Sequence, residues 1–228
     1  MIPLRDDNPV RSRPVVTIAL IVLCSLVFLW QISLSPYGQQ QAAYLFGLIP
    51  AVLFGNAELQ GQWIPAGATL VTSMFLHGGW LHLLGNMLYL WIFGDNIEDR
   101  LGRGRFIAFY LLCGVVAALG QGLADPRSEV PMIGASGAIS GVLGAYIVLY
   151  PRAKILVLVP LVIFITTLRV PALVVLGIWF AGQLLSSLAA ESGAGGGVAF
   201  AAHVGGFVAG LAMIRLFARE RRQPRSRA

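Results

Sequence analysis

Six long apolar stretches constrain most strongly what this chain can fold into. A bilayer hydrocarbon core of about 30 Å requires about 20 predominantly apolar residues per helix. The stretches lie at roughly 15–34, 69–94, 105–124, 132–150, 171–190 and 198–217. Hydrophobic residues make up 57% of the chain and charged residues only 11%, which excludes an ordinary soluble domain. The sequence therefore predicts an all-α, polytopic membrane protein.

A seventh apolar stretch, Ile155 to Leu168, is too short to span a bilayer as a helix. It contains Pro160 and is rich in valine, isoleucine and threonine, residues that helices do not favour. We therefore expect an interfacial or re-entrant segment here.

The placement of basic residues predicts the topology. Arginines precede the first stretch and follow the last, so the positive-inside rule places both termini in the cytoplasm and requires an even number of spans. Six spans satisfy this rule, because two further basic connections then also face the cytoplasm, whereas the outer connections hold only Arg127. These residues are Arg5, Arg11 and Arg13; Arg100, Arg103 and Arg105; Arg152, Lys154 and Arg169; and Arg219, Arg221, Arg222, Arg225 and Arg227.

This topology divides the chain into a basic tail (1–14), a six-helix domain (15–217) and an Arg-rich tail (218–228). It also explains the net charge of +6, since arginine-rich tails suit anionic lipid headgroups. We expect membrane lipid as a partner and no nucleic acid. No small-residue cleavage site follows the first span, so we expect this span to be a retained signal-anchor. Short basic tails without a transit peptide favour a bacterial plasma membrane.

Two outer connections have distinctive compositions. The first, about 35–68, is long and apolar, so we expect it to lie partly in the membrane interface. The last, 191–197, is dominated by glycine. Such a segment forms either a movable cover or a slack tether between two helices.

Two reactive side chains lie in stretches that are otherwise apolar. Ser136 opens the fourth within Gly134-Ala135-Ser136-Gly137, and His203 lies in the sixth. Polar groups at membrane depth are costly and usually functional. Both stretches run from outside to inside in the six-span topology. The two side chains are therefore expected at similar depth, near the outer face.

Small residues would let these two helices touch. Alternatively, the glycines serve packing alone. Close approach would bring His203 within reach of Ser136, whose hydroxyl becomes a nucleophile only when a base takes its proton. Neither stretch contains an aspartate to orient the imidazole, so we expect a Ser-His dyad oriented by packing. The small residues are Gly137, Ser140, Gly141 and Gly144 in the fourth stretch, and Ala202, Gly206 and Gly210 in the sixth.

Donors for an oxyanion are available upstream. His82 and Asn86 are spaced i, i+4 and share one helix face. Both side chains can donate a hydrogen bond, as can the backbone N–H of Ser136 at its glycine-rich helix start. Helix–helix hydrogen bonds are the alternative role for both side chains. His77, nearer the loop, is expected to brace that loop.

These motifs resemble the rhomboid intramembrane serine proteases. The resemblance rests on Gly134-Ala135-Ser136-Gly137, on His203-Val204-Gly205-Gly206 and on His77-Gly78-Gly79-Trp80-Leu81-His82 continuing to Asn86. It also includes Glu98-Asp99-Arg100-Leu101-Gly102 and covers roughly residues 60 to 217. It implies a six-helix bundle whose short fourth helix begins below the outer surface, inside a water-filled cavity.

The resemblance also implies roles for individual residues. Ser136 matches the nucleophile and His203 the base, while His82 and Asn86 match positions that serve the oxyanion. Glu98, Arg100 and Gly102 match a structural motif at the cytoplasmic end, and Trp179 and Phe180 match the lateral gate through which substrate enters. Some members carry an aromatic residue that packs on the histidine where this chain has Ser140. What orients His203 is therefore left open.

The predicted function is intramembrane endopeptidase activity on transmembrane proteins, with no metal or organic cofactor. One alternative is a catalytically inactive relative that binds membrane clients. Another is a transporter or metal-binding protein using His77, His82 and His203, although carboxylate partners are lacking in the spans.

Overall fold

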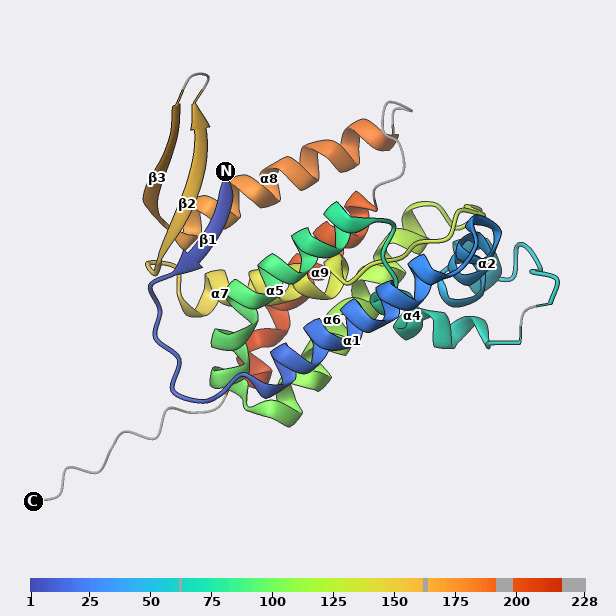
Figure 1. Ribbon diagram of the computed structural model, residues 1–228, viewed down its shortest axis with the longest axis horizontal. Helices are drawn as coiled ribbons and strands as arrows, with labels where there is room; N and C mark the ends of the chain where they lie inside the picture. Colours follow the sequence, from blue (N-terminus) through green and yellow to red (C-terminus); the bar gives the residue numbers. More distant parts are fainter. Residues whose placement is uncertain (62, 162–163, 192–198, 219–228) are drawn as a thin grey trace, which may run out of the picture.

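Helices account for most of the computed structural model, which describes residues 1–61, 63–161, 164–191 and 199–218 (Figure 1). The glycine-rich connection and the Arg-rich tail named above fall outside the described residues, except for Glu191 and Ala218. Each of the six long apolar stretches contributes a helix. These are α1 (Val15–Ser33), α5 (Trp80–Leu101), α6 (Arg103–Ala124), α7 (Ser136–Leu149), α8 (Ala172–Glu191) and α9 (Phe200–Phe217).

Three of the described helices, α1, α6 and α9, are long and apolar enough to cross a membrane. Shorter apolar helical stretches occupy Ala66–Phe75, Ser136–Leu149 and Ala172–Leu188. The chain thus has the composition of an integral membrane protein, and its helices pack around α7. Half-length helices such as α7 are expected where a helix is surrounded by protein instead of lipid.

The second apolar stretch does not form one helix, so the predicted span 69–94 is wrong. Short helices α4 (Thr69–Thr72) and η2 (Ser73–Phe75) come first, and α5 begins only at Trp80. The break falls at His77-Gly78-Gly79, where two glycines disfavour a helix. At its other end α5 continues to Leu101, because the polar residues after Gly94 are held by contacts with the N-terminal segment.

The first outer connection contains further short helices, α2 (Pro36–Phe46), α3 (Pro50–Leu53) and η1 (Ala66–Ala68). Proline at the first position starts both α2 and α3, where its missing N–H costs nothing. Within the connection, the rings of Phe46 and Trp63 contact each other edge to face, with 6.0 Å between their centroids.

A three-stranded antiparallel sheet corrects the all-α expectation. The segment expected to be interfacial or re-entrant forms a hairpin of β2 (Lys154–Leu161) and β3 (Phe164–Pro171). The strand β1 (Ile2–Asp6), part of the predicted tail, pairs with β2 in the order β1-β2-β3. The β-branched residues of the hairpin fit a pleated surface better than a helix. Figure 1 shows the sheet beside the first turns of α8.

The N-terminal segment is tied to the helices by polar contacts. Tyr146 of α7 donates a hydrogen bond to Asp6 at 2.5 Å, and the Asn96 side-chain amide donates to the same carboxylate at 2.9 Å. Burial raises the pKa of Asp6 above its ordinary value. These contacts join β1 to the C-terminal parts of both α5 and α7.

The helices α7 and α9 touch through their backbones, as the small residues predicted. A Cβ atom added at Gly206 would lie 2.0 Å from the carbonyl oxygen of Gly137, and one at Gly210 would lie 1.9 Å from that of Gly141. Both distances are far below a van der Waals contact, so only glycine permits this approach. Figure 1 shows α7 near the centre of the bundle, with α9 alongside. This contact sets how far the N-terminal ends of α7 and α9 lie from each other.

Glu98 joins α5 to α1 and is buried, with 2% of its surface exposed. Its carboxylate accepts hydrogen bonds from the backbone N–H groups of Val16 at 3.0 Å and Thr17 at 2.8 Å, and from the Thr17 hydroxyl at 2.9 Å. The first N–H groups of a helix have no intrahelical acceptor. Glu98 therefore caps α1 from a different helix, with the charge sign that a helix N-terminus favours.

Replacing Glu98 by alanine is expected to destabilise the protein. Hydrogen bonds to charged groups contribute about 1.5–3 kcal/mol each, so we expect a loss of about 3 kcal/mol or more and a Tm lower by roughly 6–12 °C. The buried thiols of Cys24 and Cys113 report unfolding through their reaction with a maleimide dye during heating. Asp99→Asn is the matched control, because Asp99 makes only exposed contacts with Ser12. An unchanged Tm in Glu98→Ala would refute the capping role.

Candidate active site

Ser136 and His203 meet in a hydrogen bond. Ser136 is the first residue of α7, and His203 lies in the first turn of α9. The Ser136 Oγ atom lies 2.7 Å from the His203 Nε2 atom. The close contacts of Gly206 with Gly137 and of Gly210 with Gly141 set the separation of the two helices, and with it this distance. Such an arrangement can move the serine proton to the imidazole.

His82 lies beside the backbone that leads to Ser136. Its Nδ1 atom accepts a hydrogen bond from the Gly78 N–H at 3.3 Å, so the ring proton belongs at Nε2. A Cβ atom at Gly134 would lie 2.7 Å from that Nε2 and 3.8 Å from the Ser136 Oγ. Gly134 also has a φ of +128°, which L side chains rarely adopt. Glycine here is required both by conformation and by the close approach of the ring.

Asn86 follows His82 by about one turn of α5 and is buried. Its Nδ2 atom has no hydrogen-bond partner among the described residues. A buried donor without a partner is costly and rare in folded proteins. The Ser136 N–H, at the first position of α7, has no acceptor within its own helix. Among the described residues the Asn86 Nδ2 donor is thus unoccupied, and His82 Nε2 lies beside Gly134, two residues before the serine.

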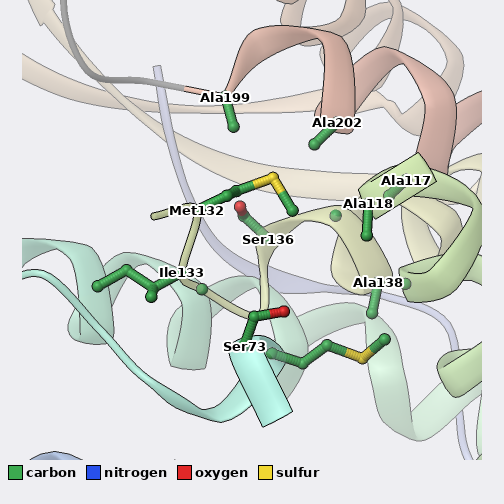
Figure 2. A pocket seen from close by; sticks show the side chains of 13 residues that line it. Ser73, Ala117, Ala118, Met132, Ile133, Ser136, Ala138, Ala199 and Ala202 are labelled. Atoms are coloured by element: carbon green, nitrogen blue, oxygen red, sulfur yellow. The ribbon is translucent and has the colours of Figure 1, made fainter. Parts of the chain in front are cut away.

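A pocket of about 320 Å³, including open space at its mouth, lies at Ser136. Figure 2 shows the Ser136 side chain among the residues that line the pocket, Met132 included. The walls come from η2, α6, α7 and α9 and carry mainly small side chains. The lining residues are Ser73, Met74, Gly114, Ala117, Ala118, Met132, Ile133, Gly134, Ser136, Gly137, Ala138, Ala199 and Ala202.

The sequence did not identify Gln183 of α8, which lies against His203. The Gln183 Oε1 atom is 2.5 Å from the His203 Nδ1 atom. The expectation that packing alone orients the imidazole is therefore wrong. Ser140 takes no part in this contact, because its hydroxyl donates to the Ser136 carbonyl at 2.7 Å. A glutamine within the apolar α8 was the available signal, since polar groups in such stretches are costly.

Trp179 and Phe180 of α8 pack against α9. The Trp179 ring lies 6.0 Å from the His203 ring and 6.1 Å from the Phe207 ring, measured between centroids. Phe180 stacks on Phe207 at 4.4 Å. Trp179 also lies 6.4 Å from Tyr89 of α5. These aromatic contacts join α8 to the rest of the bundle beside the Ser136–His203 pair.

The remaining predicted residues lie away from Ser136 or behind His82. His77 is buried, its backbone N–H donates to the Gln31 side chain at 3.0 Å, and its ring lies 5.2 Å from that of His82. Arg100 lies in the last turn of α5, and Gly102 separates α5 from α6 with a φ of +78°. Within the described residues, no group of three or more His, Cys, Asp or Glu side chains could hold a metal ion.

Three known proteins that are similar to this chain are each named as rhomboid or rhomboid-like proteins. The chain is 34% identical over 162 residues to Rhomboid protein 1, mitochondrial, of Saccharomyces cerevisiae, covering 67% of this chain and 42% of that protein. It is 39% identical over 111 residues to Rhomboid protease GluP of Bacillus subtilis, covering 46% of this chain and 20% of that protein.

A third relative is Presenilin-associated rhomboid-like protein A, mitochondrial, of Danio rerio. It is 37% identical over 112 residues, which cover 48% of this chain and 29% of that protein. The chain thus spans less than half the length of these relatives. The family model for the Rhomboid domain matches residues 62–220. Since this match covers more than half of the sequence, the chain belongs to the rhomboid family.

Proposed function

We propose that the protein is an intramembrane serine endopeptidase. It cleaves peptide bonds in or next to transmembrane segments of other membrane proteins. The observation that carries this proposal is the 2.7 Å contact between Ser136 Oγ and His203 Nε2. Membership of a family that includes a relative named as a protease adds support.

In the proposed reaction Ser136 Oγ attacks the scissile carbonyl carbon while its proton passes to His203 Nε2. The tetrahedral intermediate collapses when the C–N bond breaks and His203 returns the proton to the leaving amine. Water then attacks the carbonyl carbon of the acyl-enzyme while His203 Nε2 takes a proton from it. The bond from that carbon to Ser136 Oγ breaks, His203 returns the proton to Oγ, and the new carboxyl end is released. No metal or organic cofactor takes part.

The negative oxygen of each intermediate requires donors placed in advance. We assign this role to His82 Nε2, Asn86 Nδ2 and the Ser136 N–H. The unpaired state of Asn86 Nδ2 supports the assignment, because a donor that lacks a partner at rest gains one as the charge develops. Removing one such donor typically lowers kcat by about 10²–10³-fold.

The pocket at Ser136 suits a small substrate side chain. Five of the residues that line it are alanines, at positions 117, 118, 138, 199 and 202. Their methyl groups contact a substrate side chain without selecting for a polar one. We therefore propose cleavage after a small residue in a transmembrane segment that unwinds easily. We further propose that the substrate enters between α5 and α8, past Trp179 and Phe180.

The proposed arrangement in the membrane has six spans, with both termini on the cytoplasmic side and the Ser136 pocket open to the outer face. The basic connections of the sequence support it. Relatives are named from mitochondria, a chloroplast and Bacillus, so they do not support a bacterial plasma membrane over another membrane.

A fluorophosphonate probe tests the proposal directly. The purified wild-type protein in detergent should become covalently labelled, and a chelator should leave the labelling rate unchanged. Peptide mass spectrometry should locate the label on Ser136 and not on Ser140, one turn later on the same helix. Absence of label on folded protein, as judged from buried thiols of Cys24 and Cys113, would contradict the proposal and favour a client-binding protein.

A further inference from the structure

The side-chain amide of Gln183 is a hydrogen-bond partner of His203 that comes from a separate helix. Gln183 Oε1 lies 2.5 Å from His203 Nδ1, while His203 Nε2 lies 2.7 Å from Ser136 Oγ. The imidazole is therefore held at both nitrogens along one line of contacts. That line runs from α8 through α9 to the start of α7.

This contact selects the tautomer of the ring. An amide oxygen can only accept a hydrogen bond, so Nδ1 must carry the proton. Nε2 then presents its lone pair to the Ser136 hydroxyl, as a general base must. In the opposite tautomer the ring could not take the serine proton at Nε2. After proton transfer Nδ1 still donates to the same oxygen, so the contact persists through the reaction.

The other neighbours of His203 do not provide this selection. The rings of Trp179 and Phe200 lie 6.0 Å and 6.4 Å from the imidazole between centroids. Those rings limit its tilt, but they offer no acceptor in the ring plane. Ser140 bonds to the Ser136 carbonyl instead. Among the described residues, Gln183 supplies the acceptor at Nδ1.

We propose that Gln183 is a positioning residue of the active site, which fixes the tautomer and direction of His203. This inference rests on the proposed protease function. An amide suits the location, because an uncompensated carboxylate in a membrane-embedded site is costly. It supplies the orientation that an aspartate supplies in soluble serine proteases, without a resting charge.

The position of Gln183 also links catalysis to α8. Gln183 lies about one turn after Trp179 on the same helix, so both lie toward one face. Any movement that takes α8 away from α9 separates Oε1 from Nδ1. The base is then fully aligned only when α8 is seated on α9.

Three substitutions at position 183, with one control on the same helix, test this role. Gln183→Met keeps the length but loses the amide oxygen, and Gln183→Asn withdraws that oxygen by one methylene. Gln183→Glu keeps an oxygen at the same reach. Gly182→Ala is the control, because a Cβ there meets nothing within 4 Å. Cleavage of a transmembrane substrate in proteoliposomes gives kcat and KM for each variant.

We expect Gln183→Met and Gln183→Asn to lower kcat about 10²-fold, the lower end of the contribution of general acid–base catalysis. KM should stay within about twofold, since the substrate does not need the amide to bind. Gln183→Glu should retain kcat within about tenfold of wild type. Gly182→Ala should match wild type in both constants.

Each result bears on a distinct conclusion. An inactive, folded wild type overturns the proposed function itself. Active wild type with unchanged kcat in Gln183→Met and Gln183→Asn overturns only the role of Gln183. An equal loss of kcat in all three variants, Gln183→Glu included, also overturns it and indicates packing. If Gln183→Met unfolds at a lower temperature in the thiol assay, the kcat of Gln183→Asn is compared with that of Gln183→Glu. Equal values then overturn the role of Gln183, and a lower kcat in Gln183→Asn supports it.

Discussion

Ser136→Ala and His203→Ala are each expected to reduce cleavage of a transmembrane substrate by about 10⁶-fold, the loss seen when a soluble serine protease loses either residue. The physical reason is that the hydroxyl and the imidazole act as one unit. Without the imidazole the proton has no acceptor, and without the hydroxyl no acyl-enzyme forms. Activity of purified protein in proteoliposomes measures the effect.

The double variant provides the sharper test. If the 2.7 Å contact is a catalytic pair, then Ser136→Ala combined with His203→Ala should cleave no more slowly than either single variant. Ser140→Ala is the matched control, because that hydroxyl bonds only to the backbone of its own helix. Substantial cleavage by either single variant, with the control active, would contradict the assignment.

Gly210→Ala is expected to destabilise the protein strongly. The added methyl carbon would lie 1.9 Å from the Gly141 oxygen, 2.6 Å from the Gly141 carbonyl carbon and 2.7 Å from its Cα. All three are backbone atoms, so no side chain can rotate away and α7 and α9 must separate. Overpacking of this kind typically costs about 1–3 kcal/mol and occasionally more. We expect the upper end and a Tm lower by roughly 6–12 °C.

Gly205→Ala, on the same helix, is the matched control. A Cβ there meets its nearest atom, the Ala117 Cα, at 3.6 Å, which is ordinary contact. Alanine is also the better helix former by about 1 kcal/mol, so the Tm should stay or rise. Heating with a maleimide dye that reacts with Cys24 and Cys113 measures both variants. Equal Tm values for the two substitutions would show that the helices are not in backbone contact.

The sequence allowed the central helix pair to be predicted because its signals are local. Small residues recur about once per turn in both α7 and α9, and each row ends near a reactive side chain. The same reasoning placed His82 and Asn86 on one face of α5, which the structure has. Hydropathy alone placed the start of α5 too early, because Thr69–Phe75 is as apolar as a helix core but is followed by two glycines.

The sheet and Gln183 could not be predicted in this way, since both depend on contacts between distant segments. The pairing of Ile2 with Leu158 leaves no periodic signal at either position. Gln183 is one polar residue in an apolar helix, and its meaning depends on how α8 is seated against α9. Sequence spacing cannot give the rotation of one helix about another, whereas side-chain contacts in the structure do.

The β1–β2 pairing has a consequence for the order of events during synthesis. The first strand is made long before its partner at residues 155–158. Translation at about 5–20 residues per second leaves an interval of roughly 8–30 s. Throughout that interval the apolar side chains of Ile2 and Leu4, both exposed even in the finished fold, have no strand beside them. The ribosome thus completes α1, α5, α6 and α7 before β1 can pair with β2, while the packing of α9 on α6 and α7 can form only later still.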